Sequence, residues 1–142
     1  MPHDLDRFLG EQARVYDGVL DELRRGRKTG HWIWFIFPQI AGLGHSAMSQ
    51  RFAISSLDEA RAYLAHPVLG ARLRECAGML LEIEGRTAEE IFGPTDATKL
   101  RSCMTLFRRA APDEPVFAQI LDRYFDGVPD GLTDLRLESG PP

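Results

Sequence analysis

The chain of 142 residues has no long apolar stretch, which argues against a protein with membrane-spanning helices. Its longest apolar run is about seven residues, from His31 to Phe37, far short of the roughly 20 that a membrane-spanning helix needs. The N-terminal MPHDLDRFLG contains acids and lacks the apolar segment of a secretory signal. We therefore expect a cytoplasmic protein that makes no contact with a membrane.

Cysteine is scarce, and the known patterns of catalysis and metal binding are missing. Cys76 and Cys103 do not form a CxxC pair, and the four histidines share no spacing typical of metal ligands. The chain also has no GxSxG elbow, no HExxH pair and no P-loop. We expect two buried free thiols, no metal site and no cofactor.

Lysine is rare as well, since 15 of the 17 basic residues are arginine and only Lys28 and Lys99 are lysine. A compact ammonium differs chemically from a guanidinium, so these two positions are candidates for function. The formal net charge of −4 argues against general binding of nucleic acid. The segment RRGRK, Arg24 to Lys28, nevertheless has four positive charges in five residues and can bind phosphate, carboxylate or an acidic protein partner.

Helical periodicity, in contrast, is frequent. Apolar residues recur at steps of three and four from Leu5 to Leu23, and Gly26 can end this helix. Ser56 and Thr87 each precede a glutamate by three residues, which is the pattern of a capping box at a helix start. The predicted helices cover about residues 5–23, 57–66, 67–84, 88–93, 97–111 and 116–125.

The segment HWIWFIF, residues 31–37, fits two structures. Its aromatic residues and isoleucines favour a strand, but the only candidate partner is the short RFAIS over 51–55, which is too little for a stable sheet. A buried helical turn or two that ends before Pro38 is more economical. Apolar groups on every side place this turn at the centre of the core.

From these elements we predict an all-α fold, a single compact orthogonal bundle of about six or seven helices without a substantial sheet. Residues 1–127 would form the helical domain. Residues 128–142 are rich in glycine and proline and hold few large apolar groups, so we expect a loosely held C-terminal tail there.

Polar residues at the two ends of HWIWFIF point to a ligand pocket, because pockets are mostly apolar with a few placed polar groups. Lys28 and His31 precede the apolar run and Gln39 follows it. His31 is a candidate for proton transfer, since imidazole exchanges protons near neutral pH. Trp32 or Trp34 can stack on a planar ring. The alternative is a histidine bonded to the backbone beside two tryptophans that only fill the core.

A glycine-rich turn, GLGHS, follows this segment. Gly42 and Gly44 permit a close approach of the backbone, and Ser46 is a good N-cap for the next helix. Such a turn can hold an anion or can simply connect two elements.

The helix predicted over 97–111 carries a third group of polar residues. Asp96 is its expected N-cap, and Lys99 and Ser102 follow on the same side at steps of three, with Thr105 nearby. If partly buried, an amine between a carboxylate and a hydroxyl can hold phosphate or take part in catalysis. If exposed, the same residues form an ordinary solvated helix face.

The assembled pieces resemble the family catalogued as domain of unknown function 1810. They are RFLGEQARVYDGVLDEL, ELRRGRKTGHWIWFIFPQIAGLGHS, AISSLDEARAYLAHPVLGARLREC and IFGPTDATKLRSCMTLF, which together cover roughly residues 5–127. The resemblance implies a small, mainly α-helical domain and carries no established activity. The family's motif residues here are Lys28, His31, Trp32, Trp34, Pro38, Gln39, Gly42, Gly44, Ser46, Lys99, Ser102, Thr105 and Phe107. Cys103 stands where the family usually has a second serine.

We therefore predict a polar pocket for a small anionic, nucleotide-like ligand, with hydrolysis or group transfer as the accompanying chemistry. His31 and Lys99 are the candidates for catalysis, and the predicted ligand-binding residues are Lys28, Trp32, Gln39, Gly42, Gly44, Ser46, Ser102 and Thr105. This hypothesis requires Lys28 and Lys99 to lie together. The alternative is a non-enzymatic interaction module that binds an acidic protein through Arg24–Lys28.

Overall fold

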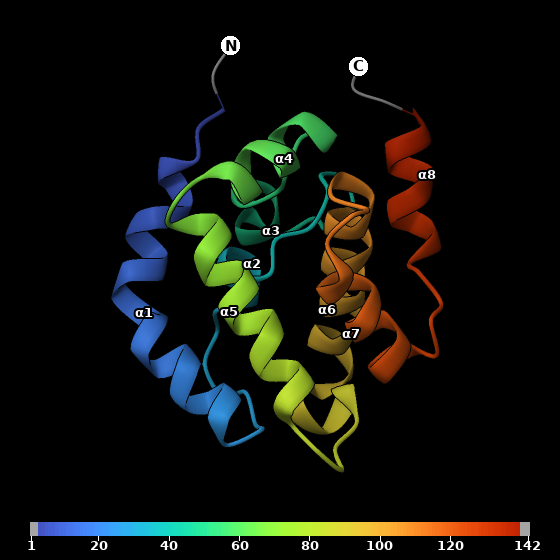
Figure 1. Ribbon diagram of the computed structural model, residues 1–142. Helices are drawn as coiled ribbons and strands as arrows, with labels where there is room; N and C mark the ends of the chain where they lie inside the picture. The colour runs from blue at the N-terminus through green and yellow to red at the C-terminus, as the bar shows by residue number, and fades with distance from the viewer. Residues whose placement is uncertain (1–2, 140–142) are drawn as a thin grey trace.

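The computed structural model describes residues 3–139, which form eight helices joined by short loops (Figure 1). The helices are α1 (Asp6–Arg24), α2 (Ile33–Ile36), α3 (Ala47–Arg51), α4 (Leu57–Ala65), α5 (Leu69–Glu82), α6 (Ala88–Ala110), α7 (Pro115–Phe125) and α8 (Gly131–Ser139). The all-α prediction is confirmed: no strand occurs over these residues, where Ile40 and Ile54 make a single parallel bridge. Within the same range, none of the helices has the length and apolarity that a bilayer span requires.

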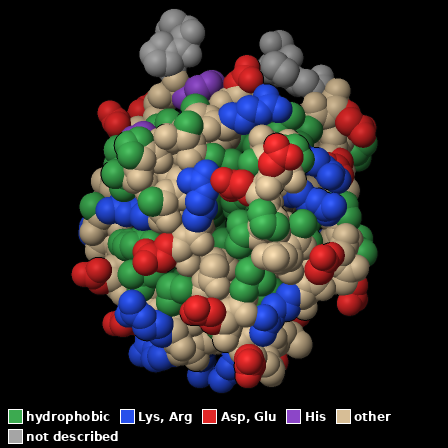
Figure 2. All heavy atoms as spheres, viewed as in Figure 1, with side chains coloured by type: hydrophobic (Ala, Val, Ile, Leu, Met, Phe, Trp, Pro, Cys, Tyr) green, Lys and Arg blue, Asp and Glu red, His purple; other side chains and the backbone are tan. Residues whose placement is uncertain are grey.

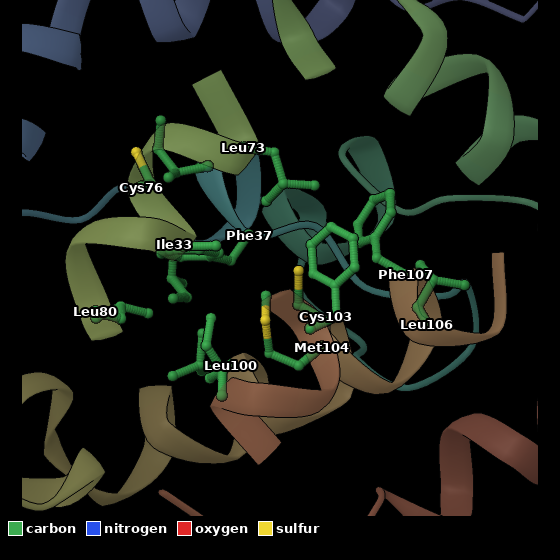
Figure 3. Packing of buried hydrophobic residues seen from close by; sticks show 14 of the residues in the cluster. Ile33, Phe37, Leu73, Cys76, Leu80, Leu100, Cys103, Met104, Leu106 and Phe107 are labelled. Atoms are coloured by element: carbon green, nitrogen blue, oxygen red, sulfur yellow. The ribbon is translucent and has the colours of Figure 1, made fainter. Parts of the chain in front are cut away.

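The short α2 lies at the centre of the core, as the helical interpretation of HWIWFIF predicted. Ile33, Phe35, Ile36 and Phe37 are each 2% exposed or less. Figure 3 shows Ile33 and Phe37 between side chains of α5 and α6 that point toward them. The candidate partner RFAIS contributes only Ile54, whose N–H donates to the carbonyl of Gln39 at 2.8 Å. Burial on nearly all sides thus stabilises a single helical turn that would be marginal alone.

The long α6 is bent at Gly93, which has φ 80° and ψ 160°. Upstream of the bend, Thr87 and Glu90 form the predicted capping box by reciprocal hydrogen bonds. Downstream, the expectation that Asp96 caps a helix over 97–111 is wrong, because helical backbone resumes at Pro94, at the position after Gly93. Asp96 therefore lies within the first turn of the second segment, and its carboxylate is available for side-chain partners.

The last helix, α8, occupies part of the range in which the sequence predicted a loosely held tail. It lies along α6 on the outside of the bundle (Figure 1). The Arg109 guanidinium donates two hydrogen bonds of 2.9 Å to the Asp134 carboxylate, one to each oxygen. The division into a domain over 1–127 and a tail over 128–142 stays a prediction, and residues 1–2 and 140–142 lie outside the described part of the chain.

The surface carries both signs of charge. On the face shown in Figure 2, acidic and basic side chains are interspersed with hydrophobic atoms between them. Both cysteines are free and buried. Burial raises the pKa of the Cys76 thiol to about 12, which makes it a poor nucleophile.

Candidate functional site

Both lysines and both tryptophans of the chain meet around one carboxylate, that of Asp96. Lys28 Nζ lies 2.7 Å from Asp96 Oδ2, and Lys99 Nζ lies 3.1 Å from Asp96 Oδ1. Each ammonium also lies over an indole ring: Lys28 is 5.2 Å from the centroid of Trp32, and Lys99 is 5.7 Å from that of Trp34. The structure thus brings together the two lysines that the sequence singled out.

Lys28 is held in place by the loop that follows α1. Its backbone N–H donates to the carbonyl of Ile91 at 2.7 Å, and its ammonium also donates to the carbonyl of Gly30. Glu22 Oε1 fixes the rest of the loop by accepting from Thr29 N, Gly30 N and Trp32 Nε1 at 2.6, 2.9 and 3.0 Å. The Lys28 side chain is only 6% exposed. It is therefore a fixed, nearly buried charge.

Lys99 is the more accessible of the two lysines, with 22% of its side chain exposed. Burial of the Asp96 carboxyl works to raise its pKa, but the hydrogen bonds from Lys28 and Lys99 outweigh it and hold that pKa below its ordinary value. Asp96 is thus ionised at neutral pH. Two ammonium charges share one carboxylate charge, so the cluster carries a net charge of about +1, and Lys99 is the more exposed of its two ammonium groups.

Lys99 is also part of the wall of a cleft of about 730 Å³ between α6, the segment around α3 and the start of α8. The lining residues are Trp34, Gln39, Leu43, Gly44, His45, Ser46, Ser49, Pro94, Thr95, Thr98, Lys99, Ser102, Asp130 and Leu132. The wall is mixed in character: an indole ring and two leucines alternate with hydroxyl, amide and charged groups. This is the composition expected of a small-molecule site.

Five of the predicted site residues line this cleft: Gln39, Gly44, Ser46, Lys99 and Ser102. The Ser46 side chain caps α3 by accepting from Ser49 N at 3.1 Å. The Ser102 hydroxyl has its single proton within reach of two acceptors, Asp130 Oδ2 at 3.1 Å and Thr98 O at 3.2 Å. Among residues 3–139 the side-chain amide of Gln39 has no hydrogen-bond partner, so it is free to bind a ligand.

Three other predicted residues lie outside the lining. Trp32 is 3% exposed and packs against Phe92 in the core, so Trp34 is the indole that reaches the cleft. Thr105 is fully buried and accepts a hydrogen bond from the backbone N–H of Asp130 at 2.9 Å. A Cβ at Gly42, which has φ +96°, would lie 2.5 Å from the guanidinium of Arg136, so this glycine accommodates an arginine of α8.

His31 lies apart from Lys99. It is exposed and lines a separate depression of about 440 Å³, together with Arg14, Glu22 and Phe35. The structure therefore does not bring the two candidate catalytic residues into one cleft. Within the described range, no group of three or more histidine, cysteine or acidic side chains is placed to hold a metal ion.

The sequence interpretation missed the acidic wall of the cleft, which comes from the start of α8. Asp130 Oδ2 accepts hydrogen bonds from the backbone N–H and the hydroxyl of Thr133, at 3.0 and 2.5 Å. Asp130 thus caps α8 while it binds Ser102 of α6. The signal was present as an aspartate three residues before a threonine, but the surrounding glycines and prolines indicated a tail.

The comparisons agree with this architecture. The family model described as "Protein of unknown function (DUF1810)" matches residues 2–137. The crystal structure of the conserved hypothetical protein Rv1873 from Mycobacterium tuberculosis is similar, with 51% sequence identity and a TM-score of 0.95, over 97% of this chain and 99% of that chain. No curated protein matches the chain.

Proposed function

The chain belongs to the DUF1810 family of proteins of unknown function, and we propose that it binds a small anionic ligand in the cleft beside α6, with Lys99 as the anion-binding residue. The observation that carries the proposal is the shared carboxylate. Because Lys28 already pairs with Asp96 at 2.7 Å, Lys99 has a charge that Asp96 only half neutralises. An anion that enters the cleft neutralises the remaining positive charge of Lys99.

Other groups of the cleft support the same ligand. The second segment of α6 begins at Pro94, and Pro94 and Thr95 line the cleft, so the positive end of this helix dipole lies there. The Gln39 amide and the hydroxyl of Thr95 add hydrogen-bond donors. Asp130 opposes an anion less than a free carboxylate would, because Ser102 and Thr133 donate three hydrogen bonds to it.

The cleft also suits a ligand with a ring. Its volume of about 730 Å³ lies in the range typical of small-molecule sites. Trp34 supplies a half-buried indole in the lining. A ligand whose anionic group binds Lys99 and whose ring stacks on Trp34 is nucleotide-like. For hydrolysis or group transfer in this cleft, Lys99 is the amine within reach, whereas His31 belongs to another depression.

Isothermal titration with AMP tests the proposal. A charge-assisted hydrogen bond contributes about 1.5–3 kcal/mol, so Lys99→Met should weaken AMP binding by roughly 10- to 150-fold. Arg61→Met is the matched control, because it removes one positive charge from α4, where the side chain is 55% exposed, lies 3.5 Å from Asp58 and donates to the carbonyl of Ala110 at 3.4 Å. AMP affinity should be unchanged in this control. Absence of saturable binding of AMP and inorganic phosphate, or equal affinity in Lys99→Met, contradicts the proposal.

A separate observation favours a second candidate function, the docking of an acidic protein segment. Arg25, Arg27 and Arg86 line one surface depression of about 360 Å³ together with Thr29. None of these three arginines has an ion-pair partner in the part of the chain that the structure describes. Lys28, which the sequence placed in this patch, is buried on Asp96, and Arg86 from the loop before α6 takes its place.

Binding of a fluorescent oligoglutamate peptide, followed by anisotropy, tests this second function. The double variant Arg25→Gln/Arg86→Gln should lose the peptide, since arginine forks bind carboxylates in pairs of hydrogen bonds. The control Arg14→Gln/Arg61→Gln removes the same charge from other exposed positions. An equal loss in both double variants shows general electrostatic attraction and contradicts a specific docking site.

A further inference from the structure

Lys99 has two roles in the cleft that exclude each other. Its ammonium is the group that meets an anion, and the same ammonium lies over the ring of Trp34, 5.7 Å from the centroid. Trp34 is the aromatic residue of the lining. A planar ligand that stacks on this face of the indole must therefore displace Lys99.

We propose that Lys99 covers the Trp34 ring until an anionic group draws the ammonium away, so that the cleft selects ligands carrying a planar ring and an anionic group together. Nucleoside monophosphates have this chemistry. The inference rests on the proposed anion-binding function and specifies the class of ligand that fulfils it.

Lys99 can leave its position at low cost because Asp96 keeps a partner. Lys28 binds the other carboxylate oxygen at 2.7 Å and is 6% exposed, so it remains in place when Lys99 moves. Lys99 is partly exposed and has a flexible four-carbon stem, which allows its ammonium to move to a ligand in the cleft. The two lysines therefore have different roles: Lys28 holds the Asp96 carboxylate, and Lys99 is mobile.

A ring and an anion are consequently coupled. A ring alone has to displace the ammonium from the indole without offering it a new partner. An anion alone gains Lys99 but leaves the uncovered indole facing water. When both are present, the anion takes the ammonium and the ring takes the indole face, so each makes the binding of the other more favourable. At a partly exposed site a cation–π contact corresponds to about two- to fivefold in affinity, which sets the size of the coupling.

The test measures the affinity for adenosine with and without inorganic phosphate, at constant ionic strength, by isothermal titration. In the unchanged protein, saturating phosphate should tighten adenosine binding about two- to fivefold. Lys99→Ala leaves the ring permanently uncovered. This variant should bind adenosine at least as tightly as the unchanged protein does without phosphate, and phosphate should no longer have an effect. Trp34→Leu should lose adenosine and keep phosphate, and Arg61→Met should behave like the unchanged protein.

Three results overturn the inference. If adenosine binds the unchanged protein equally well with and without phosphate, or binds Lys99→Ala more weakly, Lys99 does not cover the ring. Phosphate and AMP that still bind in a Lys99-dependent manner then leave the proposed function intact. If neither phosphate nor AMP binds at all, the proposed function fails and this inference fails with it.

Discussion

Replacing Lys28 by methionine tests the charge of the lysine pair alone. Lys28 does not line the cleft, so the substitution removes a positive charge without removing a contact with the ligand. In Lys28→Met, Asp96 has only Lys99 as a partner, and the net charge of the cluster falls from about +1 to about zero. The remaining ion pair holds Lys99 more firmly. Anion binding should therefore weaken even though no ligand contact is removed.

The size of the effect follows from Coulomb's law. An anion beside Lys99 lies roughly 8–10 Å from Lys28, and at an effective dielectric constant of about 30 their attraction is about 1 kcal/mol, or about fivefold in Kd. Stability should also fall. Breaking a buried pair costs about 3–5 kcal/mol when a charge is left alone. Here Asp96 keeps Lys99 and is partly exposed, so we expect about 1–2 kcal/mol.

Isothermal titration with inorganic phosphate measures the first effect and urea unfolding the second. The matched control is Arg61→Met, which removes one exposed positive charge from α4, outside the cleft and outside the arginine depression. Asp96→Asn should change the phosphate affinity in the opposite direction, because it leaves two ammonium groups without a carboxylate. We expect phosphate to bind about fivefold more tightly to this variant, whose stability should be lower. If Lys28→Met and Asp96→Asn shift the phosphate affinity in the same direction, the charge argument is refuted.

Four further predictions concern stability. Because the folded-state pKa of Asp96 is lowered, its contribution is present at neutral pH and is lost as the pH falls below about 4, so Asp96→Asn should flatten the decline in unfolding free energy at acid pH. Gly42→Ala should destabilise by about 1–2 kcal/mol, since φ is +96° and the methyl group would meet a guanidinium. Gly78→Ala, where an added methyl group on α5 meets no atom within 4 Å, should be neutral or stabilising by about 0.5–1 kcal/mol, and thermal unfolding measures both glycine variants. Thr105→Val should speed hydrogen exchange in α8 and leave α1 unchanged, because the hydroxyl accepts from the amide that leads into α8.

The fold was largely predictable because its signals are local. Capping boxes, helical periodicity and glycine stops each depend on residues within one or two turns, and Thr87 with Glu90 shows the expected hydrogen bonds. The helical form of HWIWFIF was predictable from the lack of a strand partner. The helix α8 was not predicted, because the glycines and prolines around it outweighed its local signal, the Asp130 cap, and because its contacts with Ser102 and Thr105 join residues far apart in the sequence.

The candidate site was only partly predictable for a geometric reason. The meeting of Lys28 and Lys99 was expected from their rarity, but which side of each helix faces the cleft depends on tertiary packing. Trp32 and Trp34 are two residues apart, and tertiary contacts of Trp32 with Phe92, Phe37 and Glu22 hold it in the core while Trp34 reaches the cleft. Ser102 and Thr105 are one turn apart and are 2% and 0% exposed, yet only Ser102 lines the cleft, which again depends on how the start of α8 packs against α6.

Titration of the two indole N–H signals by NMR with AMP tests the central claim most directly. Trp34 lies in the cleft, whereas Trp32 is 3% exposed and donates to Glu22 at 3.0 Å, so it is an internal control. We predict a saturable shift of the Trp34 signal, a much smaller one of Trp32, and loss of the response in Lys99→Met. A Trp34 signal that does not move, or that moves equally in Lys99→Met, contradicts anion binding by Lys99 in this cleft.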